Sequence, residues 1–471
     1  MKSQDPNTSA DIFSTRRDFL KISSAALAAG LATMEALTAN AQEATSLAKQ
    51  CNFSALPPGF VYLNSGTEGS MPECVLATLQ DSLKKWASDP TTSYETDPAL
   101  GKHQELNREK VAAFLGTGRN NICLTDNTTM GLSMTLMGLN FRPDDKVVTT
   151  NHEHNAIKSP LQILQERIGI QVETQVFPAS ETLSGMDSNE LLDTLFPNSP
   201  NLRGARALCV SHVYPSTGVR LPLAALREKA DELEIDYLIV DGAQAMGMID
   251  LTSGADNIEN CDFYACPGHK WLNGPPSTGV LYVRNENLRP PEFYPTISQR
   301  MGMYANCDSQ SDTCFPIAEA LQVRGCSNTP GFAAMISAMK FAKDVGGSAQ
   351  IEKHILTLSR EVKDSILSRA PRSIVSPHSD SDLASGLTVF FPFKWDRPET
   401  TFRDQKTANQ VVRELLDRNI QVRSIGFADA GSSGESSEAS YAVRVSTGYF
   451  NTTSQIKLLN DALEAVLTRI G

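Results

Sequence analysis

Strand-like and helix-like hydrophobic patterns alternate along the first two thirds of this 471-residue chain. Short apolar runs typical of buried strands are separated by segments whose apolar residues recur at the spacing of amphipathic helices. The predicted strands are 146–150, 170–177, 206–212, 235–240 and 262–266, and the predicted helices between them include 161–168 and 221–234. This alternation predicts an α/β fold with a mostly parallel, doubly wound sheet that carries helices on both faces.

A different pattern begins near residue 330 and predicts a smaller C-terminal α+β domain. Its predicted helices are 331–345, 348–370, 403–418 and 453–470, and its predicted strands are 387–393, 421–424 and 442–446. Segment 429–440 is rich in Gly, Ser and Ala and is predicted to be a mobile loop. The predicted organisation is a signal segment (1–41), an N-terminal arm that packs across both domains (42–75), a large domain (76–325) and a small domain (326–471).

The first segment has the pattern of an export signal. Arg16 and Arg17 precede a mildly apolar run rich in Ala and Gly, and Ala-Asn-Ala follows at 39–41, as in twin-arginine signals. The alternative is an amphipathic helix with a chance arginine pair. The run is too short and too weakly apolar for a stable membrane span, and Glu35 interrupts it. We therefore expect the twin-arginine translocase as a partner and a periplasmic or otherwise exported protein. Since that route carries folded proteins, a cofactor inserted before export is also expected.

Charge and composition narrow the classes of partner. The formal net charge is −12, and residues 1–41 contain four basic and four acidic side chains, so the charge survives their removal. An acidic surface repels phosphate backbones, which argues against a nucleic-acid partner. Nine cysteines are too few for a disulfide scaffold. An oxidising destination permits disulfides, and Cys307 with Cys314 is the first pair to test, although buried thiols remain the default interpretation for most of the nine.

Two strand-end positions are the first candidates for chemistry. Asp241 ends the apolar run 235–240, and a buried carboxylate there needs a cationic partner. Lys270 follows the predicted strand 262–266 and precedes a turn rich in Gly and Pro, where partial desolvation would favour a neutral amine suited to Schiff-base chemistry. Taken alone, Asp241 is more commonly explained as a helix cap, and Lys270 as a surface lysine in a turn.

Taken together, Asp241, Gln244, His269 and Lys270 reproduce the Asp-x-x-Gln and His-Lys signature of a family. The chain resembles the class V aminotransferases among the fold-type I enzymes that use pyridoxal 5′-phosphate (PLP), which include cysteine desulfurases, isopenicillin N epimerases and kynureninases. The resemblance runs from about Tyr62 to near the C-terminus. It implies that Lys270 is the catalytic lysine that joins PLP as a Schiff base. It also implies that Asp241 keeps the pyridine nitrogen protonated, that Gln244 lies near the phenolic oxygen, and that His269 belongs to the cofactor site.

Further matches imply the remaining contacts of the cofactor. Thr128 and Thr129, at a predicted helix start, match the turn that holds the phosphate, although an ordinary helix cap fits them as well. His154, rather than His152, matches the histidine that stacks on the ring, whereas the residues alone would equally suit a metal site or a cap. Tyr214 is a candidate contact of the ring's phenolic oxygen.

The substrate site and the assembly follow from the same resemblance. Arg444, in the segment 443–452, matches the arginine that binds the substrate α-carboxylate, for which a planar guanidinium is suited. A homodimer is expected because fold-type I active sites are completed by a second subunit.

Three departures from the family pattern bear on activity. Pro267 stands where relatives carry a polar residue that contacts the phosphate, and proline cannot donate a hydrogen bond. Residues 325–328 stand where many relatives carry the Gly-Thr that reaches the neighbouring subunit's phosphate, and Ser327 could substitute for that threonine. No cysteine lies between Val422 and Arg444, where desulfurases carry their nucleophile, which argues against sulfur transfer through a persulfide.

The resulting expectation is a PLP enzyme that acts at the α-carbon of an amino acid or of a peptide-linked amino acid. An epimerase or a lyase needs no keto-acid supply outside the cytoplasm, and 269–272 looks like isopenicillin N epimerases. One alternative is a periplasmic aminotransferase or lyase that modifies a siderophore or another peptide product. Another is a cofactor-free binding protein that kept the fold.

Overall fold

The structure is a computed structural model that describes residues 53, 55–90, 101–297, 316–429 and 439–470. The predicted signal 1–41, Cys307 and Cys314, and most of the predicted loop 429–440 lie outside these residues. The described residues all belong to one compact unit, 47–471. Within the described part of the chain, no helix combines the length and the apolar character needed to cross a membrane.

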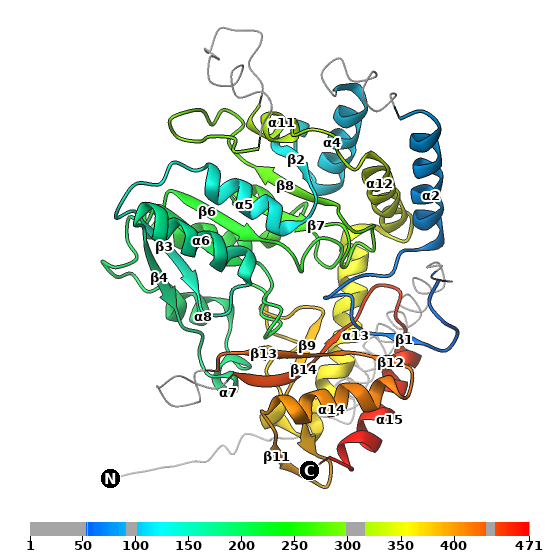
Figure 1. Ribbon diagram of the computed structural model, residues 1–471. Helices are drawn as coiled ribbons and strands as arrows, with labels where there is room; N and C mark the ends of the chain where they lie inside the picture. The colour runs from blue at the N-terminus through cyan, green and yellow to red at the C-terminus, as the bar shows by residue number, and fades with distance from the viewer. Residues whose placement is uncertain (1–52, 54, 91–100, 298–315, 430–438, 471) are drawn as a thin grey trace, which may run out of the picture. The chain divides into compact units, whose positions relative to one another are not determined.

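A seven-stranded sheet forms the centre of this unit (Figure 1). Its strands lie in the order β2 (Ile122–Thr125), β8 (Gly279–Val283), β7 (Phe263–Pro267), β6 (Tyr237–Asp241), β5 (Ala207–Ser211), β3 (Lys146–Thr150) and β4 (Gln171–Gln175). Strand β8 runs antiparallel to both of its neighbours, and the other pairings are parallel. The prediction of a mostly parallel sheet is therefore confirmed, with β8 as the exception.

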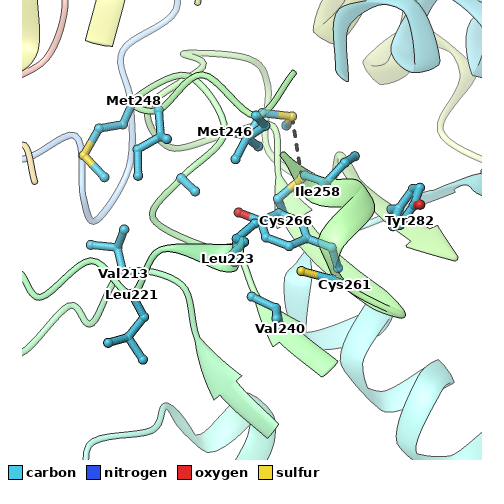
Figure 2. Close-up of a cluster of buried hydrophobic side chains, with 14 of the residues drawn as sticks. Val213, Leu221, Leu223, Val240, Met246, Met248, Ile258, Cys261, Cys266 and Tyr282 are labelled. Atoms are coloured by element: carbon cyan, nitrogen blue, oxygen red, sulfur yellow. Dashed lines mark hydrogen bonds between the residues drawn. The ribbon is translucent and has the colours of Figure 1, made fainter. Parts of the chain in front are cut away.

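Apolar side chains cover both faces of this sheet, because successive residues of a buried strand point to opposite sides. Alternate positions divide between two core clusters: Val148 of β3 and Val240 of β6 belong to one, whereas Val147 and Ile239 belong to the other. Helices α8 (Ser188–Leu195) and α9 (Leu223–Glu232) contribute to the first cluster, and α5 (Thr128–Gly138) and α6 (Asn155–Ile168) contribute to the second. Figure 2 shows part of the first cluster, in which Cys266 Sγ lies 3.6 Å from Met246 Sδ.

Helix α6 begins at Asn155, ahead of the predicted start at residue 161. His154 caps it, since its Nδ1 accepts a hydrogen bond from the Ala156 N–H at 3.1 Å. Pro160 lies inside the helix. Because proline usually marks a helix boundary, the sequence pattern predicted that the helix begins after it. The early start places the first turn of α6 beside the candidate site described below.

The C-terminal part contains an antiparallel three-stranded sheet of β13 (Arg423–Phe427), β14 (Ser440–Ser446) and β9 (Leu387–Phe390), in that order. Helices α13 (Gly347–Arg369), α14 (Gln405–Leu416) and α15 (Thr453–Leu467) share an apolar core with it. A hairpin of β10 (Phe393–Lys394) and β11 (Arg397–Thr401) was not predicted by the sequence pattern. The remaining helices include α2 (Glu73–Ser88), α4 (Gly101–Leu115), α7 (Ser180–Leu183), α11 (Ile317–Gln322) and α12 (Thr329–Asp344), and α12 packs against α2.

Segment 61–69 links the C-terminal strands to the loop that carries Lys270. Its strand β1 (Val61–Tyr62) pairs in parallel with β12 (Ile420–Gln421). At the other end, the Gly69 N–H donates to the His269 carbonyl at 2.7 Å. This path brings the polar residues between the two ends into the candidate site.

Candidate active site

A cavity of about 410 Å³ lies at the carboxyl ends of the central parallel strands. The last residues of β5, β6 and β7, which are Ser211, Asp241 and Pro267, all line it, as expected for ligand sites of such sheets. Eight of the nine residues proposed from the sequence also line it, namely Thr128, Thr129, His154, Asp241, Gln244, His269, Lys270 and Arg444. The fold therefore gathers residues from across the chain into one hollow.

Asp241, which is buried, and Lys270, which is half-buried, carry opposite charges and interact electrostatically in this cavity. Asp241 is 4% exposed, and its Oδ1 accepts the Ala243 N–H at 2.8 Å. Burial raises the pKa of Asp241, and the positive charge of Lys270 opposes that rise. Burial likewise lowers the pKa of Lys270 to about 8, against the attraction of Asp241. A substantial fraction of Lys270 is therefore a neutral amine near pH 8, the form that attacks a carbonyl carbon.

The N-terminus of α5 offers an anion site on another wall of the cavity. The first N–H groups of a helix have no partner inside the helix. Here the Asn127 side chain accepts the Met130 N–H at 2.9 Å, which leaves the N–H groups of Thr128 and Thr129 for a ligand. The Thr128 Oγ1 is buried and has no partner among the described residues. Such a helix start is suited to a phosphate group.

The two neighbouring histidines occupy different environments. His154, at the start of α6, is exposed and lines the cavity. His152 is buried outside the cavity lining, where its ring stacks on Phe177 at 4.5 Å and its Nε2 lies 2.6 Å from the Ala428 carbonyl oxygen. Burial lowers the pKa of His152 to about 4, so it stays neutral. Of the two rings, His154 is thus the one available to a ligand in the cavity.

Gln244 and His269 lie on the lysine side of the cavity. The Gln244 amide is fixed at both ends: its Nε2 donates to the Gly66 carbonyl at 2.8 Å, and its Oε1 accepts the Trp271 Nε1–H at 2.9 Å. His269 has a buried Nδ1 with no hydrogen-bond partner in the described part of the chain. An unpaired buried nitrogen in a cavity wall is a position that a ligand atom can satisfy.

Tyr214 is placed differently from the expectation. Its side chain is fully buried and does not line the cavity, and its hydroxyl donates to Glu153 Oε1 at 2.8 Å. The expected contact with the phenolic oxygen is therefore corrected: Tyr214 supports Glu153 behind the cavity wall. Ser211, three residues earlier, lines the cavity, and its hydroxyl donates to Glu153 Oε2 at 2.6 Å.

Arg444 is a buried cation that has no carboxylate partner among the described residues. It is 2% exposed, its Nη2 donates to Thr67 Oγ1 at 2.6 Å, and its Nε is unpaired among the described residues. Burial lowers the pKa of Arg444 to about 9, and neighbouring Arg423 adds to this effect. Sequence reasoning missed Arg423 and Thr67, which also line the cavity. The pairing of β13 with β14 puts Arg423 opposite Arg444. This register could not be predicted from the sequence of either strand alone.

These side chains fit PLP. The helix start and the unpaired Thr128 hydroxyl suit its phosphate, Asp241 suits its ring nitrogen, and Lys270 suits its aldehyde. The unpaired Nε of Arg444 suits the carboxylate of a substrate.

The family comparison agrees with this chemistry: the sequence model of Aminotransferase class-V matches residues 61–459. The chain belongs to the class V aminotransferase family. It is a PLP-dependent enzyme. Neither the family match nor the assembled site supports the alternative of a cofactor-free binding protein.

Two curated relatives of this class V enzyme span most of its length. A probable cysteine desulfurase of Methanothermobacter thermautotrophicus is 25% identical and covers 86% of this chain and 94% of its own. An isopenicillin N epimerase of Streptomyces clavuligerus is 24% identical over 87% of this chain and 96% of its own. Among solved structures, C-DES with glycine covalently linked to its PLP cofactor has a TM-score of 0.68 at 23% identity, covering 89% of this chain and 99% of that chain. The expected fold-type I fold is thereby confirmed.

The structure locates the residues at which this sequence departs from the family pattern. Pro267 lines the cavity, and its ring nitrogen carries no hydrogen to donate. Ser327 is not part of the described cavity lining, so any role toward a neighbouring subunit stays a prediction. No cysteine occurs among the described residues of that lining.

Proposed function

We propose that this enzyme acts at the α-carbon of an amino acid, or of an amino-acid unit in a peptide, and that its reaction is most like that of an isopenicillin N epimerase. One observation carries the proposal. The same cavity is lined by a lysine with a lowered pKa, a buried carboxylate and a buried arginine that pairs with no acidic side chain in the described part of the chain. A lysine that binds the cofactor and an arginine that binds a carboxylate are the parts that α-carbon chemistry requires.

Bound PLP supplies an electron sink that makes the Cα–H bond of an attached amino acid acidic. Arg444 binds the α-carboxylate and fixes the orientation of Cα in the cavity. Lys270 would hold the cofactor, and as a neutral amine it would be the general base that takes the Cα proton. Epimerisation would then require that a proton return to the opposite face of Cα. Asp241 stabilises positive charge at the ring nitrogen. The N-terminus of α5, with Thr128 and Thr129, would hold the phosphate, and His154 would contact the ring.

The absence of a suitable cysteine favours epimerisation over sulfur transfer. Several curated relatives are cysteine desulfurases, including the archaeal protein above. No cysteine lies between Val422 and Arg444 to act as a sulfur acceptor. The stretch 269–272 resembles the epimerases, and an epimerase regenerates its cofactor in each turnover. Transamination or elimination on a siderophore or another peptide is the second candidate, supported by the export pattern at 15–41.

We further propose an exported homodimer. The twin arginines and the Ala-Asn-Ala motif support export, and the deep resemblance to fold-type I enzymes supports a second subunit at the active site. Light scattering of the purified protein should give twice the mass of one chain. A monomer that binds the cofactor fully and turns over substrate would contradict the dimer.

Borohydride reduction tests the cofactor assignment. Reduction of the purified yellow protein should fix the cofactor on the peptide that contains Lys270. Lys270→Ala should abolish both the fixation and the turnover, whereas Lys340→Ala, at an exposed lysine outside the cavity, should change neither. Fixation on another lysine would contradict the proposed site.

Incubation with candidate amino acids in deuterated water tests the reaction. Epimerisation predicts deuterium at Cα and both configurations in the recovered amino acid, without keto acid or cleaved product. Stoichiometric keto acid would instead identify transamination, and a released fragment would identify a lyase. Either result would overturn the epimerase proposal and leave the PLP assignment intact.

A further inference from the structure

We propose that Arg423 is a specificity-determining residue that binds a second carboxylate of the substrate, so that the natural substrate unit is an acidic amino acid. This inference rests on the proposed function, because it assumes that Arg444 binds the α-carboxylate. The observations that carry it are the position, the charge and the hydrogen bonds of the two arginines.

Arg423 and Arg444 lie directly opposite each other on neighbouring antiparallel strands, and both line the cavity. Their hydrogen bonds meet at one atom: Thr67 Oγ1 accepts from Arg444 Nη2 at 2.6 Å and from Arg423 Nη1 at 3.1 Å. The two donor nitrogens can therefore be no farther apart than the sum of these distances, 5.7 Å. Like charges placed opposite each other on a sheet destabilise it. Here Arg444 is buried, whereas Arg423 is exposed and can meet a ligand from solvent.

The Thr67 hydroxyl cannot neutralise the two guanidinium charges. It already donates to Asn64 Oδ1 at 2.8 Å, so with two guanidinium donors its hydrogen and both of its lone pairs are used. It also carries no charge. Both arginines thus keep further N–H groups that this hydroxyl cannot accept, and the buried Nε of Arg444 is one of them.

Two other arginines of the described chain show the contrast, because each is neutralised by two carboxylates. Arg403 pairs with Asp429 at 2.7 Å and with Glu181, and Arg220 pairs with Glu352 at 2.7 Å and with Asp256. Within the same described residues, no carboxylate lies at ion-pair distance from Arg423 or Arg444. The two cavity arginines are therefore left for anions of a ligand.

The phosphate of the cofactor is expected to bind away from the two arginines. Its expected site is the N-terminus of α5, whereas the two arginines lie on β13 and β14 and converge on segment 61–69. A substrate with one carboxylate would leave one of the two guanidinium charges without a counter-charge. An amino acid with a side-chain carboxylate supplies both anions within the short span that the shared Thr67 sets.

Matched pairs of acids without an amino group test this inference on the holoenzyme. Succinate, glutarate and adipate are compared with butyrate, pentanoate and hexanoate by calorimetric titration. At least one diacid should bind about tenfold or more tightly than its monoacid of equal length, as expected for one added charge-assisted contact. Arg423→Gln should remove the preference for diacids and leave the affinity for monoacids within about twofold of the unaltered enzyme. Arg423→Lys should keep most of the preference for diacids.

Arg397→Gln is the charge-matched control, because Arg397 is exposed and lies outside the cavity lining. It should leave the diacid preference unchanged. Equal affinity for diacids and monoacids in the unaltered enzyme would overturn the inference. So would an Arg423→Gln variant that loses both affinities equally, because a single carboxylate clamped by both arginines gives that result.

Turnover separates this inference from the proposed function. Glutamate should exchange its Cα proton for deuterium at least about tenfold faster than glutamine, and Arg423→Gln should raise the KM for glutamate more than it lowers kcat. Equal exchange of the two amino acids would overturn the second anion site while supporting α-carbon chemistry. Failure of borohydride to fix a cofactor on Lys270 would instead overturn the proposed function.

Discussion

Glu153 is a carboxyl group held in the protein interior behind the candidate active site. It accepts hydrogen bonds from the hydroxyls of Thr150, Ser211 and Tyr214 at 2.8, 2.6 and 2.8 Å. Burial, opposed by these hydrogen bonds, raises its pKa to about 7. Asp241 contributes to the rise because two buried carboxylates disfavour each other's charge. Glu153 thus changes charge near neutral pH, one layer behind the cavity.

Replacing Glu153 by Gln should flatten part of the pH dependence of stability. The folded-state pKa lies above the ordinary value of 4.5, so the stability that Glu153 contributes is complete below pH 4.5 and is lost as pH rises through 7. Between pH 5 and 8 the unaltered protein should lose about 2–3 kcal/mol of unfolding free energy that Glu153→Gln does not lose. Urea unfolding across this range measures the difference. Glu399→Gln, at an exposed position, is the control, and parallel curves for Glu153→Gln and the unaltered protein would contradict the expectation.

The sequence predicted the positions of some site residues correctly and that of Tyr214 wrongly. The motifs located Asp241 directly after an apolar run, and Lys270 and His154 four residues after one. A strand end in a parallel sheet is a recognisable place for a ligand site. The motifs misplaced Tyr214, because successive residues beyond a strand turn in different directions and a motif does not state which one faces the cavity. Ser211 faces it instead.

At the scale of elements, hydrophobic periodicity located helices and strands better than it located their partners. The strand predicted at 146–150 is β3, and the helix predicted at 348–370 is α13 with one residue's difference at each end. The opposition of Arg423 to Arg444 depends on the register between β13 and β14, which long-range packing decides. A residue whose role arises from its cross-strand neighbour could therefore not be predicted from its own segment.

Helix α13 contains a lysine in its buried face. Lys363 is 1% exposed, and its Nζ donates to the Ser385 carbonyl at 3.3 Å. Burial lowers the pKa of Lys363 to about 7, a fall that Asp364 opposes and Arg360 reinforces. Since the folded-state pKa lies below the ordinary 10.5, the protein loses stability as pH falls from about 10 toward 7.

Lys363→Met should therefore stabilise the protein, and more so at low pH. Methionine fills the same narrow space without a charge, and the Ser385 carbonyl keeps the Ser359 hydroxyl at 2.9 Å as a donor. The gain in unfolding free energy should be about 2–3 kcal/mol larger at pH 6 than at pH 9. Denaturant unfolding at the two pH values measures it, with exposed Lys340→Met as the control. An equal gain at both values would show that packing, not charge, sets the effect.

At the scale of the whole molecule, an acidic protein carries a locally cationic site. The net charge is −12, yet Lys270, Arg423 and Arg444 line one cavity with Asp241. The net charge argues against negatively charged partners such as nucleic acids. The site, however, depends on residues between positions 64 and 444 that come together only when the chain folds. Composition alone could therefore exclude partners but could not name a substrate.

Export is the property of the whole chain that the N-terminal sequence predicts. Because the twin-arginine route recognises both guanidinium groups, replacing Arg16 and Arg17 by lysines should hold the folded enzyme in the cytoplasm while conserving charge. Cell fractionation should find the unaltered chain, shortened near residue 41, outside the cytoplasm. The control replaces Arg418 by Lys, far from the signal in sequence, and should not affect export. Unchanged export of the Arg16 and Arg17 double variant would show that the pair arose by chance.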